Sequence, residues 1–218
     1  MDGLPFFEYL SAFSEDLILG FQNHLLLSVQ ILVVATGIGV VLGMLVYRNK
    51  FAAAAALGAL ATWFTIPSIA LLGLFVPLLG AGLITGFPVI TMYGLLPVLR
   101  NTIAGLNSVD AATLDSARGI GMGRFRILWQ IELPLAWPVI LTGIRVSGQL
   151  IVGLVAIAAY VQVAGLGEML YGALTDLGSV NTFNEALAGT LLVAIIALLL
   201  DAAFVLVRRF STPKGIRV

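Results

Sequence analysis

Five long apolar runs dominate this sequence and limit the folds that it can adopt. They extend over about residues 25–47, 52–79, 83–104, 135–163 and 186–207. A helix of about 20 apolar residues is long enough to cross the roughly 30 Å hydrocarbon core of a bilayer. Each run meets or approaches this length. The sequence therefore predicts an all-α fold, a polytopic membrane bundle of five transmembrane helices that forms a single domain over residues 1–218.

The composition excludes a soluble enzyme. Apolar residues make up 60% of the 218 residues and charged residues 10%, whereas soluble domains carry about 45–50% and about 25%. So much apolar surface cannot be buried inside a chain of this length. With no cysteine and one histidine, His24, the chain lacks the ligands of a typical zinc site, so no metal is expected. Eleven basic and eleven acidic residues cancel, which gives no indication of a nucleic-acid partner.

The charged residues sort to opposite sides of a five-span arrangement. Apart from Arg145 inside span four, every Lys and Arg follows span one, three or five: Arg48, Lys50, Arg100, Arg118, Arg124, Arg126, Arg208, Arg209, Lys214 and Arg217. The charged residues on the opposite side are all acidic: Asp2, Glu8, Glu15, Asp16, Glu168, Asp176 and Glu185. Because cytoplasmic loops are enriched in Lys and Arg, we expect the N-terminus outside the cell membrane and the C-terminus in the cytoplasm.

The segment before span one is not predicted to be a cleaved signal peptide. Residues 1–16 contain acidic residues but no Lys or Arg, so the basic region that begins a signal peptide is missing. Residues 6–13 (FFEYLSAF) leave two interpretations open, a short amphipathic helix along the membrane surface and a mobile tail. His24, at the outer end of span one, is expected to have an interfacial role rather than a catalytic one.

Proline and glycine positions indicate closely packed helices. Pro67 and Pro77 lie inside span two, where neighbouring groups or water must satisfy the carbonyls that proline leaves free. Span one contains three glycines that favour close helix contacts: Gly37, Gly39 and Gly43.

The connection between spans three and four, about residues 105–134, is the longest on the basic side and has a helical pattern of its own. Residues 110–118 (DAATLDSAR) begin with an acid and end with a base, as the helix dipole favours. Gly119, Gly121 and Gly123 then interrupt the chain, with Gly119 placed as a helix C-cap. A second short helix is predicted over residues 124–131, ended by Pro134 where span four begins.

Two short helices hinged by glycines admit two interpretations. One is an amphipathic hairpin on the inner leaflet, held by Arg and Trp side chains. The other is a docking element that inserts into a groove of a cytoplasmic partner. The physical pattern alone does not decide between them.

Residues 115–134 (DSARGIGMGRFRILWQIELP) resemble the cytoplasmic "EAA" loop of permease subunits in binding-protein-dependent ABC importers. The family pattern is Glu-Ala-Ala, three residues, Gly, nine residues, Ile, one residue and Leu-Pro. Asp115, Ser116 and Ala117 take the first three places here, with Asp in place of Glu and Ser in place of Ala. The remaining positions match at the family's spacing: Gly121, Ile131, Leu133 and Pro134.

The resemblance extends over most of the membrane part. Residues 66–80, 95–106, 132–145 and 164–174 look like the glycine betaine, choline and osmoprotectant branch of these permeases. The methionine and polar amino-acid branches share much of this architecture, so an amino-acid permease is the alternative.

The resemblance implies a permease subunit that forms the path of an ATP-driven importer in a bacterial inner membrane. Its partners would be a second permease subunit, identical or paralogous, two cytoplasmic ATPase subunits, an extracytoplasmic substrate-binding protein and membrane lipid. The loop helix around residues 116–122, including Gly119, would dock in a cleft of the ATPase. The chain has no G-x-x-x-x-G-K-[ST] phosphate loop. We therefore expect no cofactor and no enzyme activity in this chain, with ATP and Mg on the partner ATPase.

Polar residues inside the spans are candidates for the translocation path. Arg145 is costly in lipid unless it is paired or wetted, and an extension toward the cytoplasm is the expected solution. Thr91, Gln149 and Gln162 are further candidates, with hydrogen bonds between helices as the alternative for each. Asp201 is expected to pair with Arg208, Arg209 or an arginine of the loop. The spans show no tight aromatic cluster of the kind that holds quaternary amines, so selection is expected in the binding protein.

Two rival interpretations remain. A secondary transporter or channel would need an inverted repeat or a chain of intramembrane acids, which five spans and Asp201 do not supply. A membrane enzyme would need clustered acids or histidines at one membrane face. The acids of the inner loops are Asp110, Asp115 and Glu132, and their spacing matches no metal-binding pattern.

Overall fold

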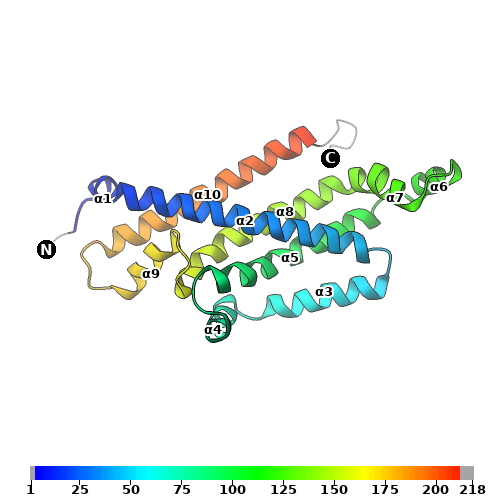
Figure 1. The fold of residues 1–218 in the computed structure, drawn as a ribbon. Coiled ribbons are helices and arrows are strands. Elements are labelled where there is room, and N and C mark those ends of the chain that lie inside the picture. Colours follow the sequence, from blue (N-terminus) through cyan, green and yellow to red (C-terminus); the bar gives the residue numbers. More distant parts are fainter. Residues whose placement is uncertain (1–2, 212–218) are drawn as a thin grey trace.

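The computed structural model describes residues 3–211, and every regular element within that range is a helix (Figure 1). In chain order the elements are α1 (Phe6–Ala12), α2 (Ser14–Val46), α3 (Lys50–Thr65), α4 (Ser68–Leu79), α5 (Leu83–Asn107), α6 (Ala111–Gly119), α7 (Arg124–Ile127), the π-helical turn η1 (Leu128–Glu132), α8 (Leu133–Ile157), the 3-10 turn η2 (Ala158–Val161), α9 (Gly167–Thr175) and α10 (Thr182–Ser211).

Within residues 3–211, four helical stretches are individually long and apolar enough to cross a membrane: Ser14–Val46, Leu83–Asn107, Arg124–Val161 and Thr182–Ser211. The α3–α4 pair, bent by 92° between its two helices, passes the same test when taken together and gives five spans if it is counted as one. The predicted all-α membrane bundle is confirmed.

The first span begins earlier than the apolar run indicates, at Ser14 rather than near residue 25. Glu15 and Asp16 lie in the first turn of α2, where acidic side chains interact favourably with the helix dipole. The preceding α1 packs against α2 and α10 through the buried Tyr9. Asn181 and Asn184 side chains hydrogen-bond the backbone of Leu4. Residues 6–13 are therefore an anchored helix, and the mobile-tail interpretation is wrong.

The second span is a broken helix rather than a continuous one. Pro67 follows Ile66, and a residue before proline is disfavoured in the helical region, so Ile66 is extended with ψ 133° and α3 ends. The Tyr93 hydroxyl of α5 donates a hydrogen bond to the Ile66 carbonyl that the break leaves free. A neighbouring helix thus satisfies this carbonyl, as expected for a proline inside a membrane span.

Helices α2, α5 and α8 form the core of the bundle. Ile31, Leu99 and Ile140, one from each helix, are fully buried. Helices α5 and α8 approach closely at Gly143, where an added Cβ would lie 2.7 Å from the Pro97 carbonyl oxygen and 2.5 Å from the Asn101 Cβ. The glycine lets the two backbones meet, as small residues do between membrane helices.

The two ends of the bundle differ in charge. The α2–α3 connection, α6, α7 and the end of α10 lie together at one end, and α1, α4 and α9 lie at the other (Figure 1). We call the first the basic end, since it carries Arg48, Lys50, Arg118, Arg124, Arg126, Arg208 and Arg209. The opposite, acidic end carries Glu8, Glu15, Asp16, Glu168, Asp176 and Glu185. Asp2, Lys214 and Arg217 lie outside the described residues.

Candidate functional site

The helix predicted over residues 110–118 forms at the basic end as α6. Asp110 is its N-cap, and its carboxylate accepts a hydrogen bond from the Thr113 backbone N–H at 3.2 Å. Asp115 forms an exposed ion pair with Arg118 of the same helix at 2.7 Å. Ala117 is buried, whereas Asp115 and Ser116 are exposed. The helix therefore presents a polar face away from the bundle while one alanine anchors it.

The glycine that ends α6 is Gly121 and not Gly119. Gly121 has a φ of +85°, and its N–H donates to the Arg118 carbonyl at 2.9 Å. The N–H of Met122 donates to the Ala117 carbonyl at 3.1 Å. These two bonds form a Schellman motif, which places Gly121 at C′, where the left-handed conformation favours glycine. Gly119 lies inside the helix, so its predicted C-cap role is wrong.

The predicted second loop helix is the beginning of span four. Residues Arg124–Val161 form one helical stretch of 38 residues, because the turn η1 joins α7 to α8. Pro134 follows that turn and does not end the helix. Within η1 the Leu133 N–H donates to the Leu128 carbonyl five residues back. This wider turn lies where a proline interrupts regular helical bonding. Ile131 and Leu133 are half-buried, and Pro134 is exposed.

A buried carboxylate joins this stretch to the first span. Glu132 is 3% exposed, and its Oε2 accepts hydrogen bonds from the Tyr47 hydroxyl at 2.7 Å and the Arg48 guanidinium at 2.9 Å. Burial, together with the hydrogen bond to Glu132, raises the pKa of Tyr47 to about 12. The hydroxyl therefore stays protonated and acts as the donor. Sequence reasoning counted Glu132 among the loop acids and missed this cluster.

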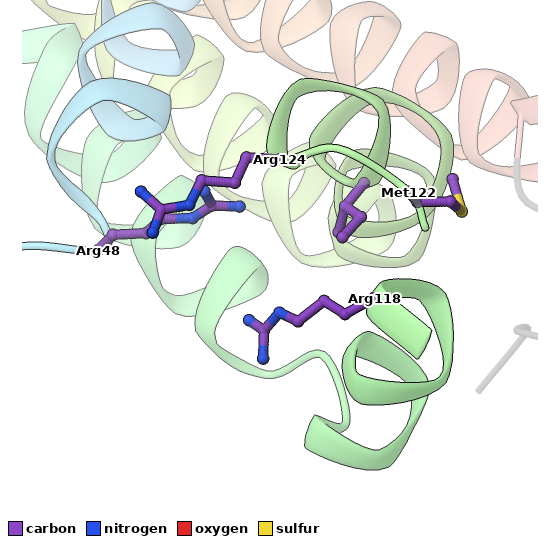
Figure 2. A pocket seen from close by; sticks show the side chains of 5 residues that line it. Arg48, Arg118, Met122 and Arg124 are labelled. Carbon is purple, nitrogen blue, oxygen red and sulfur yellow. The ribbon is translucent and has the colours of Figure 1, made fainter. Parts of the chain in front are cut away.

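A cleft of about 440 Å³ lies between the loop and the end of α2. Arg48, Arg118 and Arg124 line it from three separate elements, with Met122 and Ile127 (Figure 2). A second cleft of about 530 Å³ shares Arg48 and Arg118.

Large apolar side chains are exposed next to these charges: Ile120 at 81%, Phe125 at 75% and Trp129 at 52%. The Phe125 and Trp129 rings lie 6.0 Å apart. Exposed aromatic and aliphatic side chains among arginines are typical of a protein interaction surface.

Of the four candidate path residues, Arg145 and Gln149 come together, whereas Thr91 and Gln162 lie in other contacts. Arg145 forms a double hydrogen-bonded ion pair with Asp201 of α10, at 2.6 and 2.7 Å, and the Gln149 amide donates to the same carboxylate at 2.9 Å. Asp201 thus pairs with Arg145 of α8, a partner that was not among those expected for it. Thr91 donates to the Phe87 carbonyl of its own helix. Gln162 has a φ of +65° and follows η2 near the acidic end.

His24 does not lie at the membrane interface, as the sequence predicted, but inside the bundle. Its side chain is fully buried, and Nε2 lies 3.0 Å from the Val152 carbonyl of α8. The reason is the early start of α2, which carries residue 24 past the first helical turns and into the bundle.

Most of the chain matches a known protein family. Residues 35–213 match the family described as "Binding-protein-dependent transport system inner membrane component". The chain belongs to this family. It is therefore a multi-pass inner-membrane permease subunit, which sets aside the secondary-transporter and membrane-enzyme interpretations.

Curated relatives align with nearly the whole permease. The osmoprotectant import permease protein OsmW of Salmonella typhimurium is 38% identical over 200 residues, covering 89% of this chain and 91% of that protein. The glycine betaine/carnitine/choline transport system permease protein OpuCB of Bacillus subtilis is 32% identical over 211 residues, covering 96% and 94%.

A solved structure has the same fold. The inward-facing MetNI methionine ABC transporter contains a chain that matches this permease with a TM-score of 0.79 and 19% identity, covering 93% of this chain and 99% of that one. At this identity the likeness is one of fold alone.

Proposed function

We propose that this permease forms the membrane path of an ATP-driven importer for a small compatible solute such as glycine betaine, choline or a similar quaternary amine. The observation that supports this most directly is the identity of 38% and 32% to relatives named for osmoprotectant and glycine betaine/carnitine/choline transport, over nearly their whole lengths. The amino-acid alternative has the fold of the methionine transporter in its favour, but that fold is shared widely in the family.

The coupling loop is the proposed docking site for a cytoplasmic ATPase. We assign to it Asp115, Ser116, Ala117, Gly119, Gly121, Ile131, Leu133 and Pro134. Exposed arginines and aromatic side chains at the basic end suit a partner with an acidic, grooved surface. ATP and Mg would bind that ATPase, and its closure would move the loop together with the stretch Arg124–Val161.

The remaining partners belong to the same assembly. The α10 helix is apolar, yet only 6% of its most apolar window is buried within the chain. Lipid and a second permease subunit, identical or paralogous, would cover such a face. An extracytoplasmic binding protein would deliver the solute at the acidic end.

The proposed orientation places the basic end in the cytoplasm and the N-terminus outside. Because the chain has no cysteine, the exposed Lys50 and Asp176 can each be replaced by a single cysteine. In intact cells a membrane-impermeant thiol reagent should label Asp176→Cys and not Lys50→Cys, and both should react once the membrane is opened. The reverse pattern would contradict the orientation.

The substrate class is tested by uptake into proteoliposomes that contain the complete transporter. ATP-dependent uptake of labelled glycine betaine should occur and should be reduced by excess unlabelled choline or carnitine, but not by methionine. The matched control is the same vesicle without ATP. Methionine uptake without glycine betaine uptake would overturn the proposal in favour of the amino-acid alternative.

A further inference from the structure

The Glu132 carboxylate is buried within the protein, where an isolated charge is unfavourable. Its side chain is 4% exposed and it belongs to the turn η1, immediately before the long α8 helix. A buried carboxylate is tolerated only when it is paired and hydrogen-bonded. Here two donors converge on one oxygen, Oε2.

Both donors come from the end of the first span, which is distant in sequence. Tyr47 is the C-cap of α2 and is itself buried, and Arg48 follows it directly. The Arg48 guanidinium also lies 5.1 Å from the centre of the Tyr47 ring. The contact therefore joins the base of α8 to the end of α2, across 85 residues of sequence.

The two hydrogen bonds to Glu132 differ in their exposure to solvent. The Tyr47–Glu132 bond is buried, whereas the Arg48 side chain is 43% exposed and borders both clefts at the basic end. Arg118 and Arg124 line the cleft of Figure 2 with Arg48. Repulsion between these like charges favours the position of Arg48 on Glu132. The Tyr47 hydrogen bond is thus shielded from solvent, whereas the Arg48 side chain is accessible to charge brought near the cleft.

We propose that Tyr47, Arg48 and Glu132 form a latch through which movement of the α6–α7 segment reaches the first span. The three are positioning residues, since they act through the helices that they join. This inference rests on the proposed docking of the coupling loop on an ATPase. Of the three residues, Glu132 lies in the π-helical turn η1, a feature often found at functional sites in helices.

The latch is tested in the complete transporter by the ratio of solute imported to ATP hydrolysed. Tyr47→Phe removes one oxygen, and Glu132→Gln keeps the size of the side chain. Each should lower uptake about fivefold, the effect of a coupling contribution near 1 kcal/mol, while ATP hydrolysis stays within about twofold of the unmodified level. Tyr171→Phe, at the acidic end, is the matched control and should leave the ratio unchanged.

The double variant separates a latch from ordinary stabilisation. Because Tyr47→Phe and Glu132→Gln disrupt the same bond, the double variant should lose little more uptake than either single variant. Unchanged ratios in both single variants, or losses that multiply in the double variant, would overturn the latch. A fall in uptake and hydrolysis in parallel would also do so, because it indicates loss of folded complex. Co-purification of the ATPase with each variant is measured separately, so failure of ATPase docking is distinguishable from failure of the latch.

Discussion

Replacing Gly121 with valine should lower ATP-dependent uptake about 30-fold, because a β-branched residue at a φ of +85° carries a strain of about 2 kcal/mol. The Schellman motif would open, and α6 would lose the bonds that set where the chain leaves it. Since α6 is the element proposed to enter the ATPase, the variant should insert into the membrane normally and retain less ATPase. Both are measured on the same membranes, by immunoblot and by co-purification.

Two further substitutions make this result specific. Gly121→Asn should recover most of the uptake, since asparagine adopts the left-handed conformation more readily than other non-glycine residues. Gly58→Ala should have little effect, because Gly58 lies inside α3, away from the loop, and an added Cβ meets no atom within 4 Å. Equal losses in Gly58→Ala and Gly121→Val would show that the motif does not control docking.

Replacing Asp201 with alanine should reduce the amount of inserted permease on the order of tenfold, because Arg145 would be left without its carboxylate within a membrane span. Gln149 would lose the same acceptor. The measurement is the amount of permease in the membrane fraction relative to total permease. Gln149→Leu is the matched control and should have a small effect, since the Arg145–Asp201 pair remains.

An exchange of the two charges tests whether the pair or each residue matters. The double variant Arg145→Asp/Asp201→Arg restores opposite charges on α8 and α10 and should recover most of the inserted permease. If each single substitution is harmless, the pair does not stabilise the bundle. If the exchange restores insertion but not uptake, Arg145 or Asp201 has an additional role in the path.

Local sequence features predicted the apolar spans and the helix α6. Hydropathy located five runs because membrane helices need about 20 apolar residues whatever their neighbours are. The DAATLDSAR segment gave α6 because an N-cap acid and helix formers act within a few residues. The family resemblance of residues 115–134 supplied the interpretation that the physical pattern left undecided.

Contacts between segments that are distant in the sequence could not be predicted from these local features. For Asp201 the sequence suggested arginines close in sequence, at positions 208 and 209, or in the loop. The partner found, Arg145, lies on another helix, 56 residues away. The glycines of span one show the same limit: Gly39 and Gly43 face Val98 and Thr102 of α5, while Gly37 meets nothing within 4 Å.

The positions of helix breaks were also predicted wrongly, because they too depend on contacts with other segments. Proline was expected to end the helix at residue 134 and to be accommodated within span two. The reverse is found, with a 92° bend at Pro67 and a continuous helix through Pro134. Whether a proline breaks a helix depends on partners for the freed carbonyl and on the local turn, which the sequence alone does not display.

The stretch Arg124–Val161 has a mechanical consequence. Its 38 residues are about 57 Å long, and Gly143, which packs closely against α5, lies almost at its midpoint. Because α5 also contacts the stretch at Ala136 and Ile151, on either side of Gly143, the stretch is supported along its length and can move as one rigid helix. A tilt of about 10° would carry the two ends about 5 Å in opposite directions. In such a tilt, a displacement of the Arg124 end is matched by an opposite displacement of similar size at the Val161 end.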